Sequence, residues 1–173
     1  MFRLMCCLSS LIALFFVRHA LGSQEKVPNS AAKPLAPFAV FIGDWDCAGT
    51  FASSGKSIAA HLSFKYDLDE RWILFRHDDK PPFSYHALSE WGWDAAHMEF
   101  AMLVQDSTGG LRSFRSAGLR ERKVIWEGDA LQSAKPADQR FVFETIDSTH
   151  FQVSYFRQTD GNWRLVDSST CSK

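Results

Sequence analysis

A repeated alternation between short strand-like segments and turn residues is the feature that most constrains the fold of this chain. The clearest example runs from Ser57 to Leu68, where every second residue from Ile58 onward is apolar or small and most of its neighbours are polar. A period of two places successive side chains on opposite faces of a β-strand, whereas a helix repeats about every 3.6 residues. Because no helical period interrupts the pattern after Gly43, the sequence predicts an all-β fold.

Turn residues divide this region into about ten strand-like segments. Ser53–Lys56 and Asp106–Gly110 are the strongest turn signals, since Ser, Asp and Gly favour tight reversals of the chain. The short connections favour antiparallel pairing of consecutive strands. The expected strands are Phe41–Phe51, Ile58–Leu68, Arg71–His77, Phe83–Trp93, Met98–Gln105, Leu111–Ala117, Lys123–Leu131, Arg140–Ile146, Phe151–Gln158 and Trp163–Cys171.

The first and last of these segments predict how the sheet ends. A meander leaves two unpaired edges unless its first strand pairs with its last, and Phe41–Phe51 and Trp163–Cys171 each carry a Trp and a Cys. We therefore expect a closed antiparallel up-and-down β-barrel of about ten strands. Barrels of this size are wide enough to hold one small ligand. The apolar run Phe38–Ile42 predicts a short N-terminal helical turn that plugs one end.

The N-terminus has the features of an export signal. Arg3 precedes the apolar run Leu4–Val17, and Ala20-Leu21-Gly22 resembles a small-x-small cleavage site. The run is shorter than the roughly 20 residues of a membrane span, so no stable span is expected after cleavage; an uncleaved anchor is the alternative. We predict a periplasmic or secreted protein with three parts: a signal peptide over 1–22, a linker over 23–36 and a barrel domain over 37–173.

Cleavage of the signal would leave two cysteines, Cys47 and Cys171. In the oxidising compartment that export implies, we expect them to form a disulfide between the first and last strands; two unrelated thiols are the alternative. Closing so long a loop is worth on the order of 4 to 5 kcal/mol in the chain-entropy model. Strand alternation predicts that Cys171 shares a face with Trp163 and Leu165.

Several short motifs, in order, resemble those of a lipocalin-like family of secreted bacterial proteins, domain-of-unknown-function family 1579. Members typically open with Gly-x-Trp, carry a Gly-Tyr-Asp-like turn midway and close on Trp…Thr-Cys. The resemblance spans about 37–173 and implies a calycin-type barrel without established catalytic residues. The matching segments are Phe41–Phe51, Tyr85–Ala96 with Gly92-Trp93-Asp94, Asp106–Gly110, and Trp163 to Thr170-Cys171.

Other chemistries lack their usual sequence signatures. The formal net charge is −1 and no basic stripe stands out, so nucleic acid is not an expected partner. There is no Gly-x-Ser-x-Gly elbow and no phosphate-binding glycine loop. The histidines are scattered, and the late histidine of the related haem-binding nitrobindin barrels has only His150 as a counterpart. We therefore predict no catalytic residues, no metal and no cofactor.

Polar residues on otherwise apolar strand faces are the candidate binding residues. A buried arginine suits a carboxylate, because its guanidinium group can hold both oxygens. Arg76, Arg115 and Arg157 are therefore candidate anchors for an amphipathic ligand, with a position at the wet rim as the alternative. The expected cavity walls are Trp72, Trp91 and Tyr155, together with Phe64, Phe75, Met102 and Phe143.

Three functional hypotheses follow. The first is a barrel that binds a small apolar or amphipathic molecule. The second is an envelope interaction or inhibitor module with a packed interior and an exposed loop at Asp79–Phe83, whose protein partner the sequence does not identify. The third is an enzyme, metal or haem protein, which the missing signatures disfavour.

Overall fold

The structure is a computed structural model that describes residues 33–129 and 138–173. The predicted all-β fold is confirmed: the described residues form ten strands and one 3-10 helix, η1 (Ala36–Phe41). The predicted signal peptide and most of the predicted linker lie outside the described residues. The strands are β1 (Gly43–Phe51), β2 (Ser57–Asp67), β3 (Trp72–Asp79), β4 (His86–Asp94), β5 (Glu99–Asp106), β6 (Leu111–Ser116), β7 (Lys123–Gly128), β8 (Gln139–Thr145), β9 (His150–Thr159) and β10 (Asn162–Ser172).

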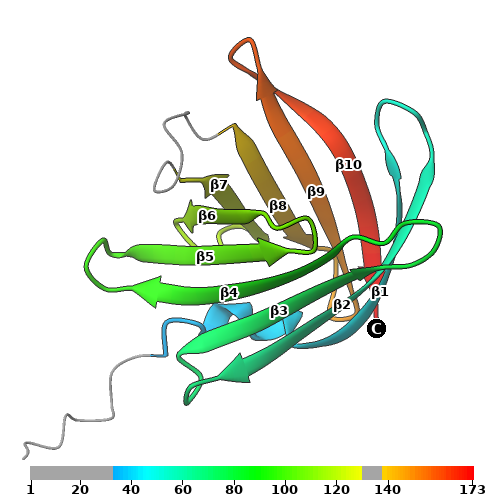
Figure 1. Cartoon of the computed structure of the whole chain (residues 1–173). Coiled ribbons are helices and arrows are strands. Elements are labelled where there is room, and N and C mark those ends of the chain that lie inside the picture. The colour runs from blue at the N-terminus through cyan, green and yellow to red at the C-terminus, as the bar shows by residue number, and fades with distance from the viewer. Residues whose placement is uncertain (1–32, 130–137) are drawn as a thin grey trace, which may run out of the picture. The chain divides into compact units, whose positions relative to one another are not determined.

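The barrel closes as predicted. Each strand pairs antiparallel with its neighbour in sequence, and β1 pairs with β10 to complete the ring (Figure 1). Cys47 stands directly opposite Cys171 in that last pairing, and the two form the predicted disulfide. The strands approach closely here: a Cβ atom on Gly49 would lie 2.0 Å from the Ser168 carbonyl oxygen. Closure therefore removes both free edges and uses a glycine where no side chain fits.

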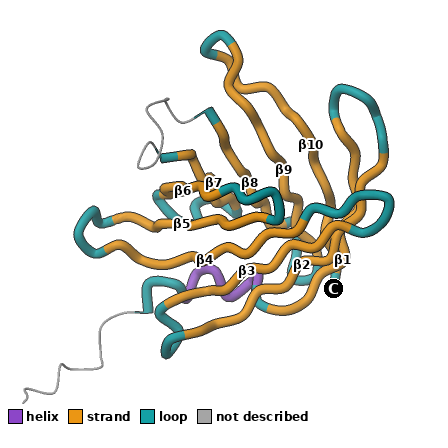
Figure 2. The backbone as a smooth tube through the Cα atoms, viewed as in Figure 1, coloured by secondary structure: helices purple, strands orange, loops and turns teal. Residues whose placement is uncertain are grey.

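The 3-10 helix lies at one end of the barrel (Figure 2), and its buried aromatic side chains, Phe38 and Phe41, seal that end. Phe38 packs edge-on against Phe100 at a ring-centroid distance of 4.9 Å, and Phe41 packs against Phe151 at 5.3 Å. Leu35 is only 1% exposed, so the packed part begins two residues before the predicted boundary at Pro37. Burying each of these large side chains contributes about 1.5 to 3 kcal/mol, which fixes the helix in the barrel mouth.

Strand β3 directs two of the expected binding residues, Trp72 and Arg76, away from the interior, whereas the expected wall residue Phe75 faces inward. Ile73 and Phe75 are buried inside the barrel, so Trp72 and Arg76, which alternate with them, face outward. Trp72 lies over the neighbouring strand, where a Cβ atom on Gly92 would come within 2.6 Å of its ring. The Trp72 indole thus fits on the outer surface because Gly92 has no side chain.

A β-bulge in β10 corrects a second expectation. The register with β9 shifts between Leu165, opposite Phe156, and Asp167, opposite Tyr155. The extra residue, Val166, reverses the alternation, so Leu165 is 42% exposed while Asp167 faces the interior with Cys171. The predicted shared face of Cys171 and Leu165 is therefore wrong, because an inserted residue changes which side chains point inward.

Candidate ligand-binding cavity

The barrel interior contains a cavity of about 530 Å³ at the end opposite the helix. The helix precedes the start of β1, whereas the cavity wall includes Phe51 at the end of β1 and Phe83 in the loop after β3. Its floor is apolar and lies next to the aromatic core around the helix. The main floor and wall residues are Leu62, Phe75, Ala87, Met102, Val104 and Phe143.

Aromatic rings line the upper wall in packed pairs. Phe51 meets Phe83 edge-on with ring centroids 5.5 Å apart, and Phe141 stacks on Tyr155 at 4.8 Å. These pairs join side chains from different strands and one loop, so each ring is held by a neighbour. A wall of fixed rings needs little reordering when it contacts a ligand, which favours binding.

Arg112 is the arginine in the described cavity wall, and its charge is already matched. Its Nη2 atom lies 2.8 Å from Asp106 Oδ2 and 2.7 Å from the Tyr85 hydroxyl, while Nη1 donates to Gln139. Hydrogen bonds from Thr108, followed by those from the Gly110 and Thr108 backbone, hold the pKa of Asp106 below its usual range. These hydrogen bonds therefore hold the Arg112–Asp106 ion pair in place as part of the wall.

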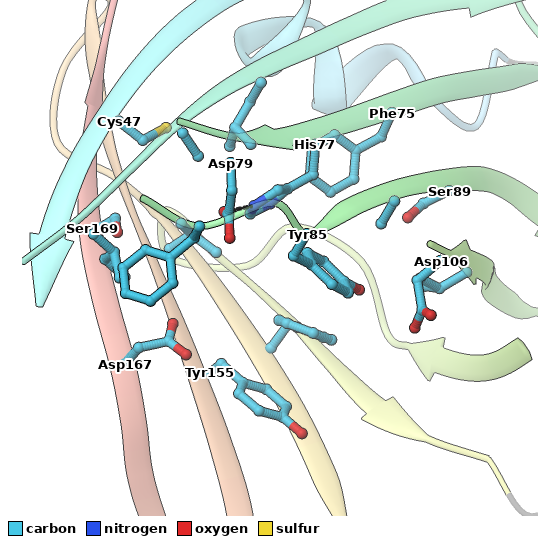
Figure 3. Close-up of a pocket in the computed structure, with 18 of the residues that line it drawn as sticks. Cys47, Phe75, His77, Asp79, Tyr85, Ser89, Asp106, Tyr155, Asp167 and Ser169 are labelled. Atoms are coloured by element: carbon cyan, nitrogen blue, oxygen red, sulfur yellow. Dashed lines mark hydrogen bonds and ion pairs between the residues drawn. The ribbon is translucent and has the colours of Figure 1, made fainter. Parts of the chain in front are cut away.

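A second polar pair comes from β3. His77 Nε2 lies 2.7 Å from Asp79 Oδ1, and both side chains are partly buried in the cavity wall (Figure 3). Because an ionised carboxylate only accepts hydrogen bonds, the imidazole N–H is the donor. The imidazole also meets the Tyr85 ring edge-on, at a centroid distance of 5.6 Å. The pair leaves Asp79 with one oxygen that the imidazole does not engage.

Asp167 is the third carboxylate in the wall, and its carboxylate points from β10 into the cavity (Figure 3). Among residues 33–129 and 138–173, no group forms a hydrogen bond or ion pair with it within the usual distances. Burial raises the pKa of Asp167 to about 6, the nearby His77 opposes that rise and the negative charge of Asp79 adds to it. The cavity thus contains a carboxylate whose charge is poorly compensated.

The predicted arginine anchors lie outside the described cavity wall. Arg76 is half exposed on the outer surface, where its Nη2 is 2.7 Å from Asp78 and holds the pKa of that carboxyl below its usual range. Arg115 also faces outward, 2.6 Å from Asp94 and 2.9 Å from Asp129. Both residues lie on the strand face opposite the buried one, which is why neither lines the cavity.

Arg157 lies on the same strand face as Tyr155, as predicted, but it is too near the end of β9 to be part of the cavity wall. It is exposed at the rim, and its Nε atom donates to the Tyr155 hydroxyl at 3.1 Å. Of the three predicted aromatic binding residues, Tyr155 lines the cavity. Trp91 is fully buried beneath it, against Phe38 of the helix, and Trp72 is on the outer surface. Sequence reasoning therefore located one of the six named binding residues in the wall.

Among the polar cavity residues that sequence reasoning missed are His77, Asp79, Asp106, Arg112 and Asp167. One signal could have found the first two: they continue the inward alternation of Ile73 and Phe75 along β3. A signal also existed for Asp167: it follows the bulge and alternates regularly with Cys171, so it shares the face of the disulfide.

Within residues 33–129 and 138–173, no three His, Cys, Asp or Glu side chains gather closely enough to hold a metal ion. No helix in the same ranges combines the length and apolar character needed to cross a membrane.

Fold and site together define a closed ten-stranded antiparallel barrel with a helix at one end and a cavity at the other. No family model and no curated protein matches the sequence. Among solved structures, the chain is similar to a de novo designed fluorescence-activating β-barrel, with 11% identity, 78% of this chain and 94% of that chain covered, and a TM-score of 0.40. A likeness this distant carries no functional argument, so function is inferred from the side chains of this chain.

Proposed function

We propose that this protein is an exported, lipocalin-like binding protein that holds a small apolar or amphipathic molecule inside its barrel. The observation that carries the proposal is the cavity of about 530 Å³, which has a mostly apolar lining and lies within a closed barrel. Ligand sites for small molecules usually measure about 300 to 1,000 Å³ and combine apolar walls with a few polar groups. The resemblance to family 1579 is consistent with this function and remains part of the proposal.

The barrel is built to keep such a site in shape. The disulfide and the strand pairing fix the wall, and the aromatic plug closes the floor. Because the walls are formed before a ligand arrives, binding can use the burial of apolar surface without ordering the protein first. Export to a periplasmic or extracellular location is supported by the disulfide, since disulfides persist in oxidising compartments.

The alternative module with a packed interior is disfavoured by the same cavity. Its proposed contact loop also has another role, because Phe83 packs on Phe51 and forms part of the cavity wall.

A substitution that fills the cavity tests the proposal. Ala87 is buried in the wall, so Ala87→Phe would occupy part of the space, whereas Ala48→Phe makes the same change on the exposed face of β1. Titration with the neutral dye N-phenyl-1-naphthylamine should give saturable fluorescence, weakened about tenfold or more by Ala87→Phe and unchanged by Ala48→Phe. A dye that binds the Ala87→Phe protein as tightly as the parent would contradict a cavity site.

Circular dichroism and the melting temperature confirm that both variants fold. Val104→Phe, at another buried wall position, repeats the test if the first variant is unstable.

A further inference from the structure

We propose that the preferred ligand of the cavity is a cation, specifically a protonated amine on an apolar body, with Asp167 as its counter-ion. This inference rests on the proposed function and specifies the class of ligand. The charges in the wall carry it, because they leave the cavity with unmatched negative charge.

The wall charges separate into a matched group and an unmatched group. Arg112 and Asp106 neutralise each other at 2.8 Å, so this pair adds no net charge to the cavity. The remaining wall groups of the acid and histidine types are His77, Asp79 and Asp167. His77 donates to one oxygen of Asp79, and Asp167 has no donor among residues 33–129 and 138–173. Several acceptor positions in this part of the wall are therefore available to a ligand that brings donors.

The surroundings of these carboxylates suit an ammonium group on an apolar molecule. Tyr155 stands opposite Asp167 on the neighbouring strand, and Phe51 and Phe83 form a packed pair in the same cavity wall. Aromatic faces attract cations, and a carboxylate in a partly desolvated site holds an ammonium group by charge-assisted hydrogen bonds. The apolar floor around Phe75 and Met102 would receive the body of the ligand.

An anionic ligand fits the same site poorly. A carboxylate would face Asp167 and Asp79 without a free cavity arginine to offset the repulsion, since Arg112 is already engaged by Asp106. Arg157 is the nearest further cation on β9, but it lies exposed at the rim beyond Tyr155. The structure thus reverses the ligand charge expected from the sequence, where arginines were the anchors.

Three probes that share one apolar body and differ in their head group test the proposal. The probes are 4-phenylbutylamine, 4-phenylbutanol and 4-phenylbutanoate, titrated by calorimetry into the unaltered protein at about pH 8, where an alkylamine is protonated and an aspartate is ionised. We expect the amine to bind about tenfold or more tightly than the alcohol, and the carboxylate to bind most weakly.

Two neutralising variants locate the effect. Asp167→Asn should reduce the advantage of the amine over the alcohol to about threefold or less, and Asp79→Asn should reduce it in part. Asp44→Asn, a matched change on the exposed outer face of β1, should leave the advantage intact. The alcohol should bind all four proteins equally, because its neutral head group gains little from either carboxylate.

The outcomes separate the two proposals. An alcohol or carboxylate that binds as tightly as the amine overturns the cation preference while leaving a ligand-binding barrel in place. A protein that binds neither these probes nor the neutral dye overturns both. Because the head-group comparison uses the unaltered protein, it decides the cation preference even if a variant does not fold.

Discussion

Replacing Asp167 with asparagine should stabilise the empty protein at neutral pH. Burial raises the pKa of Asp167 to about 6, whereas an aspartate in an unfolded chain has a pKa of about 3.9. The folded state therefore binds more protons than the unfolded state between these values, and ionisation of Asp167 removes stability as the pH rises through them. Asparagine has nearly the same shape and carries no charge, so it avoids this loss.

The size of the effect follows from the shift. Two pKa units correspond to about 3 kcal/mol, and Asp167 is only partly buried, so solvent screens its charge and we expect a gain of about 1 to 2 kcal/mol. For a domain of this length, that gain raises the melting temperature by about 3 to 6 °C. The groups near Asp167 are Tyr155 on the neighbouring strand β9, and His77 and Asp79 on β3, which does not pair with β10.

Thermal unfolding of parent and variant, followed by circular dichroism at about pH 4 and about pH 7.5, measures the gain. The difference in melting temperature should be fully present at the higher pH and small at the lower one, where Asp167 is protonated in the folded state and about half protonated in the unfolded state. Comparing variant with parent at each pH cancels the acid sensitivity of the other carboxylates. Asp44→Asn, on the outer surface, should change stability by less than about 0.5 kcal/mol. A variant less stable than the parent at about pH 7.5, or a difference independent of pH, would refute the reasoning.

Two further predictions concern the closure and the plug. Replacing Cys47 and Cys171 with serine should lower the free energy of unfolding by about 2 to 4 kcal/mol, because the disulfide closes a loop with a sequence separation of 124. Chemical denaturation of the parent with and without reductant measures the same loss. Phe41→Ala should lower the free energy of unfolding by about 3 to 5 kcal/mol, because Phe41 is fully buried among Phe64, Trp91 and Phe151. An unchanged denaturation midpoint would show that the helix is not part of the cooperative core.

The barrel could be predicted because its physical causes act locally in the sequence. Alternation of apolar and polar residues along a strand indicates which side chains face the core and which face solvent. Turn residues mark where each strand ends. Closure followed from one long-range clue, the placement of Cys47 and Cys171 in the outermost strands. The plug was predictable in the same way, since a short apolar run before the first strand had to be buried nearby.

The cavity wall could not be predicted with the same success. In β3 both faces begin with large apolar side chains, Trp72 and Leu74 on one and Ile73 and Phe75 on the other, so alternation alone does not say which is buried. The choice depends on a neighbouring strand, where Gly92 leaves room for Trp72 on the outside. Alternation is a property of one strand, whereas the direction of each face depends on register with the next.

Sequence patterns are expected to fail at functional sites. A polar residue on the inner face of a strand is one such failure. An ionised Asp167 weakens the empty barrel, because the charge is partly removed from water and the nearby Asp79 repels it. A bound cation would offset both costs by pairing with the carboxylate, and a ligand that binds only the folded state adds stability by mass action. The group that costs stability in the empty protein is thus the group that would hold the ligand most strongly. That exchange of stability for binding is typical of functional sites, and it is the physical reason to regard Asp167 as part of a binding site rather than as a packing defect.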